Sequence, residues 1–313
     1  MSALISAADL RKILSPLSRL AGEGWGEGVA TQETSPVSIT PSPSPLRGSP
    51  PSPAGQERVI KILDASYHLP PSLQGIPGAL DFDIDDIADR QAPFPHTIPS
   101  EKTFSEKTGA LGIGNDDLVI VYDRNGISMA AARAWWMFRL FGHEKVKILN
   151  GGLSAWIRAG YALAEKSSAA PPPAVFKATF KPSLLKLLDQ VKENIATKSF
   201  TLLDARDAGR FKGDTPEPRP HVQAGHIPDS ISMPYMTLIN PDGTLKPKDQ
   251  LEKAFQTAPL ARKGSLACSC GSGVTACVVA LALYELGRPD VAVYDGSWTE
   301  WGSNPLLPKA KGD

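Results

Sequence analysis

The sequence has few cysteines, no excess of charge of either sign and no long apolar run. Only three cysteines occur in 313 residues, and all lie between positions 268 and 277, so disulfides cannot link distant parts of the fold. Because 33 basic side chains balance 33 acidic ones, no overall field would attract nucleic acid or a membrane surface. No apolar run of about 18 residues could span a bilayer, and residues 1–14 lack the pattern of a secretory signal. We therefore expect a soluble protein of the reducing cytoplasm, without nucleic-acid or membrane partners.

The composition changes abruptly near the start of the chain. Residues 6–14 carry apolar side chains at helical spacing, and Ser6 is placed to cap that helix. From about residue 15 to 56, Ser, Pro and Gly dominate, and neither a helical nor a strand period is visible. Such a stretch cannot bury enough apolar surface to order itself. It is predicted to be a disordered insertion within the first domain.

Strands and helices alternate along the remainder of the chain. An apolar run ends at Asp64, a second precedes Asp123, an apolar helix is expected over 128–143, and another strand and helix follow over 146–160. This alternation predicts an α/β fold with parallel sheets. Residues 165–182, which include three consecutive prolines, have the composition of a linker. We therefore expect an N-terminal domain over 1–164 and a C-terminal domain over 183–313.

The two predicted domains repeat the same pieces in the same order. TLLDARD at 201–207 matches KILDASY at 61–67, and GHIPDSISMP at 225–234 matches GIPGALDFD at 75–83. SCGSGVTAC at 269–277 likewise matches YDRNGISMA at 122–130, and VYDGSWTEW at 293–301 matches ILNGGLSAW at 148–156. The chain is thus two copies of one unit. Cys270 aligns with Asp123, so only the second copy carries a thiol at this place.

Cys270 stands where a predicted strand passes through a glycine-containing loop into a helix. Gly271 and Gly273 permit dihedral angles that a Cβ atom would forbid, so the backbone N–H groups of this loop can converge on one point. The start of the next helix adds its positive end. Both effects favour the thiolate and predict a nucleophile. The alternative is a buried structural cysteine, which is the commoner role of free cysteine.

These segments resemble the two-domain rhodanese-like sulfurtransferases. The resemblance runs from about residue 58 to the end, apart from the linker, and rests on LDASYHLP, FDIDDIAD, ILNGGLSAW, the loop that begins Cys270-Gly-Ser-Gly-Val-Thr, and YDGSWTEW. It implies two tandem rhodanese-like domains, each a parallel sheet flanked by helices. It also implies a catalytic C-terminal domain, an inactive N-terminal one and an active site at their interface.

The resemblance implies two-step covalent catalysis without a cofactor or a metal. Cys270 would take the sulfur of 3-mercaptopyruvate as a persulfide, release pyruvate and pass the sulfur to cyanide or to a thiol, such as thioredoxin or a small thiol. N–H groups of the loop, from Gly271 through Gly273, Val274 and Thr275, would hold the anionic persulfide. Arg210 and Arg219 match the carboxylate-binding pair of the family, although composition alone favours two solvated arginines.

The residues that would move a proton during this reaction are less completely identified. Ser272 would relay a proton in a Cys-Ser-Asp arrangement that Asp64 of the first domain completes. The family usually carries a histidine before Ile-Pro-Gly in the first domain, but this chain has Gly75 there. His68 is a weak substitute, and turnover is expected to be reduced.

Other interpretations remain open at this point. A thiosulfate sulfurtransferase would share the fold, but that subfamily usually has Arg and Lys where this chain has Gly271 and Ser272. A cysteine phosphatase of related fold would need an arginine where Ala276 stands. A metal site on the three cysteines lacks a standard zinc spacing. A non-catalytic rhodanese-like binding module is the last alternative.

Overall fold

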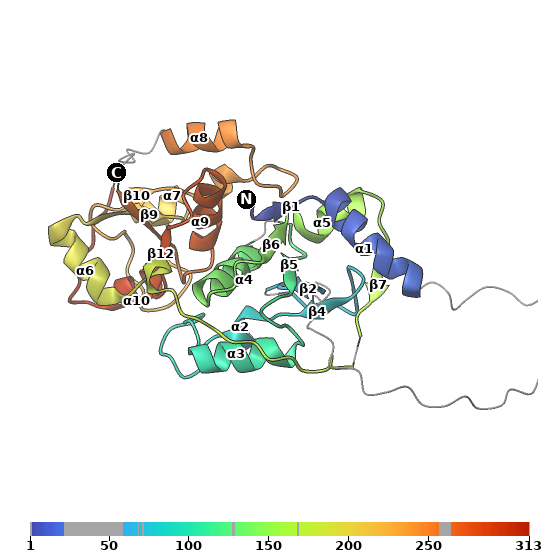
Figure 1. Ribbon diagram of the computed structural model, residues 1–313. Helices are drawn as coiled ribbons and strands as arrows, with labels where there is room; N and C mark the ends of the chain where they lie inside the picture. The colour runs from blue at the N-terminus through green and yellow to red at the C-terminus, as the bar shows by residue number, and fades with distance from the viewer. Residues whose placement is uncertain are drawn as a thin grey trace, which may run out of the picture.

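The chain forms two α/β halves that lie side by side (Figure 1). The computed structural model describes residues 2–21, 59–67, 69–70, 72–126, 129–167, 169–256 and 264–312. Each half is built on a five-stranded sheet. No helix in these ranges is long and apolar enough to cross a membrane.

The N-terminal sheet is parallel throughout and has the strand order β1-β6-β5-β2-β4. Its strands are β1 (Leu4–Ile5), β2 (Ile60–Asp64), β4 (Ala79–Asp81), β5 (Leu118–Tyr122) and β6 (Val146–Leu149). The central strands are buried on both faces and therefore read as continuous apolar runs. A separate antiparallel pair joins β3 (Gln74–Gly75) to β7 (Ala164–Glu165).

The C-terminal sheet repeats this plan with the order β10-β9-β11-β12-β8, again all parallel. Its strands are β8 (Leu185–Lys186), β9 (Phe200–Asp204), β10 (Ile231–Ser232), β11 (Ser265–Ser269) and β12 (Ala292–Tyr294). Read from β8, the order corresponds strand for strand to the N-terminal sheet read from β1. The predicted internal repeat and the two parallel α/β domains are therefore confirmed.

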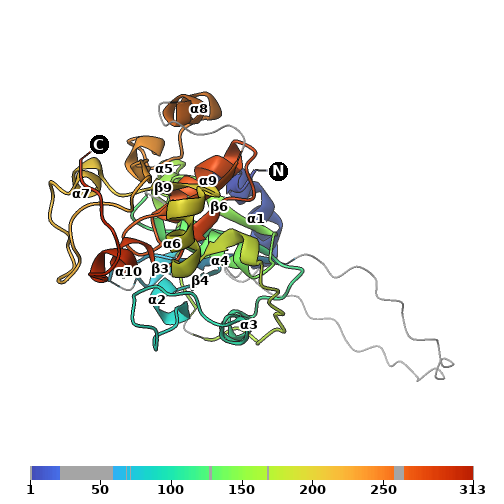
Figure 2. The same ribbon diagram turned by 90° about the vertical axis from the view of Figure 1, so that its left-hand side faces the viewer.

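Helices cover both sheets. The N-terminal half has α1 (Ala7–Ala21), α2 (Ile84–Ile87), α3 (Glu101–Ala110), α4 (Met129–Leu140) and α5 (Gly152–Arg158). The C-terminal half has α6 (Leu188–Thr197), α7 (Ala208–Lys212), α8 (Lys248–Gln256), α9 (Ala276–Glu285) and α10 (Ser297–Ser303), with 3-10 turns at Pro182–Leu184 and Tyr235–Leu238. Helices α2 and α3 lie at the end of the molecule opposite α8 (Figure 2).

The first helix is longer than the sequence predicts. Ser6 caps it as expected, because its hydroxyl accepts a hydrogen bond from the N–H of Asp9 at 3.0 Å. The helix continues to Ala21, past Pro16, so the first residues assigned to the insertion are helical instead. The hydroxyl of Ser15 donates to the carbonyl of Arg11 at 2.9 Å, one turn earlier in the same helix. The remainder of the predicted insertion, from 22 to 56, lies outside the described residues.

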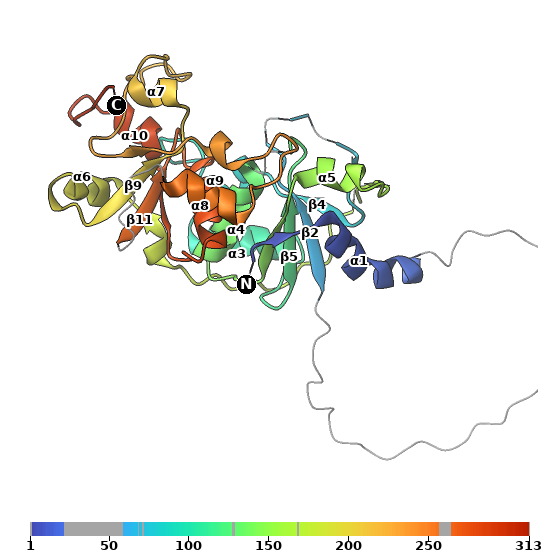
Figure 3. The ribbon, with the colours of Figure 1, turned by 90° about the horizontal axis from the view of Figure 1, so that it is seen from above.

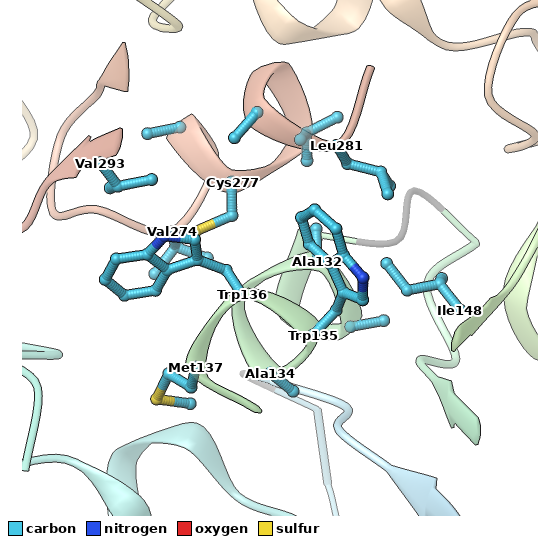
Figure 4. Packing of buried hydrophobic residues seen from close by; sticks show 14 of the residues in the cluster. Ala132, Ala134, Trp135, Trp136, Met137, Ile148, Val274, Cys277, Leu281 and Val293 are labelled. Carbon is cyan, nitrogen blue, oxygen red and sulfur yellow. The ribbon is translucent and has the colours of Figure 1, made fainter. Parts of the chain in front are cut away.

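The two halves share one apolar core, in which α4 and α9 pack against each other between the sheets (Figure 3). Trp135 and Trp136 of α4 are almost completely buried. Figure 4 shows their indole rings directed toward Val274, Cys277 and Leu281 of the C-terminal half. Helix α4 is enclosed on all sides, and apart from Arg133 and Arg139 its side chains are apolar all round. The shared core fixes the N-terminal half against the loop that precedes α9.

Candidate active site

The Cys270 loop connects β11 to α9, as the sequence predicts, and α10 holds it from one side. The N–H of Cys270 donates to the hydroxyl of Ser297 at 3.1 Å, and its carbonyl accepts from the N–H of Trp298 at 2.9 Å. The carbonyl of Gly271 accepts from the N–H of Thr299 at 2.9 Å and from the Thr299 hydroxyl at 2.5 Å. These contacts fix the loop backbone around a cysteine that is 2 % exposed.

The loop leaves a row of backbone donors without protein acceptors. Within the part of the chain that the structure describes, the N–H groups of Gly271, Ser272, Gly273, Val274 and Thr275 donate to no protein atom. They lie directly after Cys270 and directly before the first turn of α9. Unpaired donors at a helix start form a cradle for an anion.

The two glycines of the loop serve different purposes. Gly273 has a φ of +76°, and a Cβ atom there would lie 2.8 Å from the Asp295 carbonyl, so glycine is required. Gly271 has no left-handed backbone, contrary to the expectation for this position. A Cβ atom at Gly271 would instead lie 3.2 Å from Nη2 of Arg210 and 3.7 Å from Nη1 of Arg219. The missing side chain lets both guanidinium groups approach the loop.

The predicted arginine pair is therefore brought together beside Cys270. Arg210 is held by Glu217, with 2.6 Å between Nη2 and Oε2. Arg206 supports the same carboxylate with 2.8 Å between Nη1 and Oε1, and its other donors bind Asp204 and the carbonyl of Gly225. Nη2 of Arg219 lies 3.5 Å from the hydroxyl of Ser272. Two cations thus stand over the loop, and a pair of guanidinium groups has the geometry to hold a carboxylate.

A buried cation of the N-terminal half also holds the loop. Arg133 of α4 is 1 % exposed, donates to the carbonyl of Gly273 at 3.2 Å and forms an ion pair of 2.6 Å with Asp295. Burial opposes its charge, but Asp295 and the hydrogen bond to it raise the pKa of Arg133 above its ordinary value. Its guanidinium lies over the ring of Trp136, 4.6 Å from the centroid. The cysteine loop is therefore positioned by both halves.

The sequence reasoning missed His96, which contacts Ser272. Nδ1 of His96 lies 2.9 Å from the Ser272 hydroxyl, although 176 residues separate the two in the chain. The ring is buried, and its Nε2 faces Tyr67 and Asp85. In the sequence this histidine stands among the prolines of a loop, PFPHTIP, where neither a helical nor a strand periodicity marks it as buried. It is the N-terminal half that brings this ring to the cysteine loop.

Tyr235 is a second residue that the sequence did not reveal. Burial and the nearby charge of Cys270 raise the pKa of its phenol. Tyr235 therefore stays protonated at neutral pH.

Asp64 is not arranged as expected. Its carboxylate binds Lys166 at 2.6 Å and Tyr122 at 3.3 Å, and it accepts a short hydrogen bond from Ser66. Among the described residues no hydrogen bond joins it to Ser272. Lys166 lies in the predicted linker and forms ion pairs with both Asp64 and Asp81. The spacing of these three residues in the sequence does not reveal that they meet.

The position of Gly75 is filled by neighbouring side chains. A Cβ atom there would lie 2.6 Å from the Tyr122 hydroxyl and 2.9 Å from Cε of Lys166. No larger side chain fits at this position without displacing them. His68, the suggested substitute, lies outside the described residues.

The other two cysteines are poor nucleophiles. Both are fully buried and free. Burial raises the pKa of the Cys277 thiol to about 12, and that thiol donates to the Gly273 carbonyl. Burial also raises the pKa of Cys268 well above its usual range. Across the described ranges, no three His, Cys, Asp or Glu side chains gather as metal ligands would.

The first repeat has no thiol nucleophile at the position that corresponds to Cys270. Asp123, which aligns with Cys270, is completely buried, and its carbonyl accepts from the N–H of Leu153 at 2.9 Å. Its carboxylate accepts from the N–H of Ala131 at 3.4 Å, at the start of α4. A buried carboxylate at a helix start is a structural anchor.

The chain is similar to proteins of one family along most of its length. The rhodanese-like domain matches residues 55–159 and 187–304. The chain is 43 % identical over 278 residues to thiosulfate/3-mercaptopyruvate sulfurtransferase 2 of Arabidopsis thaliana, covering 80 % of this chain and 81 % of that protein. It is 40 % identical over 258 residues to 3-mercaptopyruvate sulfurtransferase of Homo sapiens, covering 79 % and 86 %.

A solved structure agrees with this similarity. The fold matches the crystal structure of SseA from Escherichia coli, described as a 3-mercaptopyruvate sulfotransferase with the rhodanese fold, with a TM-score of 0.72. The sequences are 31 % identical, and the match covers 95 % of this chain and 99 % of that one.

Replacing Arg133 by methionine should destabilise the protein by about 3–5 kcal/mol, because Asp295 would stay buried without its cation. The free energy of unfolding in urea measures this. The matched control is Lys12→Met, which breaks an exposed ion pair with Asp9 and should leave the free energy of unfolding nearly unchanged. Equal effects of the two substitutions would contradict the assigned role of Arg133.

Proposed function

The chain belongs to the family of proteins built from rhodanese-like domains, and we propose that it is a sulfurtransferase that takes sulfur from 3-mercaptopyruvate onto Cys270. One observation carries the proposal. Cys270 begins a loop with five unpaired backbone donors, and two arginines stand over Gly271 in that loop. A nucleophile, an anion cradle and a carboxylate clamp are the three parts that this reaction needs.

The parts act in sequence on a small α-keto acid. Arg210 and Arg219 bind the donor carboxylate and direct its thiol toward Cys270. The thiolate of Cys270 attacks the donor sulfur, the carbon–sulfur bond breaks, and its electron pair leaves on the pyruvate enolate. The N–H groups of residues 271–275 stabilise the negative charge of the persulfide.

The outer sulfur then passes to a second nucleophile. The acceptor is a thiol, such as thioredoxin or a small thiol, or cyanide, each of which attacks the outer sulfur and restores the Cys270 thiolate. The three cysteines are free, and free thiols persist in a reducing compartment. We accordingly assign the protein to the cytoplasm.

Thiosulfate is the second candidate donor, because the name of the Arabidopsis relative includes both donors. The loop itself favours 3-mercaptopyruvate. Its first two residues after Cys270 are Gly271 and Ser272, which add no charge for a dianionic donor. The carboxylate of a keto acid needs only the two arginines that are present.

Steady-state assays with cyanide as acceptor test the donor. We expect a higher kcat/KM with 3-mercaptopyruvate than with thiosulfate, and no turnover of either by Cys270→Ser. A higher value with thiosulfate would reverse the assignment of the donor. Turnover that survives Cys270→Ser would remove the proposed mechanism altogether.

Replacing Arg219 by methionine should weaken donor binding. A charge-assisted hydrogen bond contributes about 1.5–3 kcal/mol, so kcat/KM for 3-mercaptopyruvate should fall roughly ten- to a hundredfold, mainly through KM. The control is Arg288→Met, which removes an arginine bound to the Gly264 carbonyl outside the site. An unchanged KM in Arg219→Met would show that this arginine does not bind the donor.

A further inference from the structure

We propose that His226 is a positioning residue that holds Arg210 in place for the donor carboxylate. The inference rests on the proposed function, because it concerns an arginine that binds the donor there. His226 is 4 % exposed and lies between α7 and β10. It contacts Phe211, the residue after Arg210 in α7, and it therefore acts on the donor through that arginine.

The ring of His226 holds α7 in two ways. Its Nδ1 lies 2.8 Å from the carbonyl oxygen of Phe211, and because a carbonyl can only accept, Nδ1 carries the proton and donates it. The two rings also stack, with 3.8 Å between their centroids and 6° between their planes. Phe211 is 4 % exposed, so both contacts are shielded from water. The backbone next to Arg210 is therefore fixed against a buried ring.

A closed chain of contacts connects this backbone to the guanidinium of Arg210. Glu217 binds Nη2 of Arg210 at 2.6 Å and Nη1 of Arg206 at 2.8 Å. Nη2 of Arg206 donates in turn to the carbonyl of Gly225 at 2.8 Å, and Gly225 directly precedes His226. Arg210 is thus held at its side chain by Glu217 and at its backbone by the helix that His226 supports. One network joins the two supports.

The last described residues of the chain support His226 from the other side. The N–H of His226 donates to the carbonyl of Ala310 at 2.9 Å, and the N–H of Ala310 donates to the carbonyl of His226 at 2.9 Å. The N–H of Gly312 donates to the carbonyl of Lys212, the last residue of α7, at 3.0 Å. Gly225 has a φ of +125°, and a Cβ atom there would collide with the Ala310 carbonyl, so this close approach requires glycine.

The internal repeat is consistent with a shared role for the histidine and the arginine. Gly75 corresponds to His226, because Gly-Ile-Pro in the first copy aligns with His-Ile-Pro in the second. When the aligned segments after β2 and β9 are continued by three residues, Pro70 corresponds to Arg210. The copy that binds the donor has both residues, and the other copy has neither.

The test variant is His226→Phe, which keeps an aromatic ring beside Phe211 and removes the hydrogen-bond donor. An arginine that is fixed before the donor arrives lowers the cost of binding. Loss of a neutral hydrogen bond changes an equilibrium about three- to tenfold, so KM for 3-mercaptopyruvate should rise by about that factor at a fixed cyanide concentration, with kcat little changed. Discharge of the loaded enzyme to cyanide involves no carboxylate and should keep the wild-type rate.

A double-mutant cycle decides whether His226 acts through Arg210. Arg210→Met alone should raise KM about tenfold or more, because a charge-assisted contact is lost. Adding His226→Phe to Arg210→Met should then raise KM by less than about twofold, since the arginine to be positioned is gone. His226→Asn loses the ring stack instead and, put through the same cycle, serves where the phenylalanine variant does not fold.

Three outcomes would overturn the inference. They are a KM that stays at the wild-type value in His226→Phe, factors that multiply in the double variant, and loading and discharge that slow equally, which would show a general structural role. The control is His143→Phe, a buried histidine of the N-terminal half beside Phe138 and Phe176, which should change neither KM nor the discharge rate. A wild type that releases no pyruvate from 3-mercaptopyruvate would refute the proposed donor, and the inference with it.

Discussion

The guanidinium of Arg133 is the contact on which the candidate active site depends. It lies in an apolar helix between two sheets, where an unpaired charge would be very costly, and it is satisfied by groups from both halves. Two of these partners are the carbonyls of Gly273 and His96, and the third is Asp295. One buried ion therefore fixes the cysteine loop, the histidine that contacts it and the start of the segment leading to α10.

The two copies of the domain have diverged into different roles. The second copy keeps a cysteine at the end of β11, with donors and arginines around it. In the first copy the equivalent residue is Asp123, which is buried and tied to backbone N–H groups. That copy instead contributes α4 as the wall of the shared core and His96 as a side chain over the loop. The repeat explains how one fold can supply both the nucleophile and its surroundings.

The sequence was sufficient to predict the parallel sheets, the repeat and the cysteine loop, because each leaves a local pattern of apolar runs or glycines. Arg210 and Arg219 were accessible only through the resemblance to a known family, because composition alone favours two solvated arginines. His96 was not, because its importance arises only when two domains pack, and its proline-rich loop has no period. The partners of Asp64 were hidden for the same reason, since Lys166 lies in what reads as a linker. Strand β1 has only two residues, which is too short for a strand pattern of apolar and polar side chains to be visible in the sequence.

The central claim is that Cys270, and neither of the two buried cysteines close to it, carries the transferred sulfur. The most direct measurement is the intact mass of the protein after incubation with 3-mercaptopyruvate, followed by peptide mapping. The account predicts a gain of one sulfur atom on the peptide that contains Cys270, and no gain in Cys270→Ser. A gain that persists in that variant, located at Cys268 or Cys277, would contradict it.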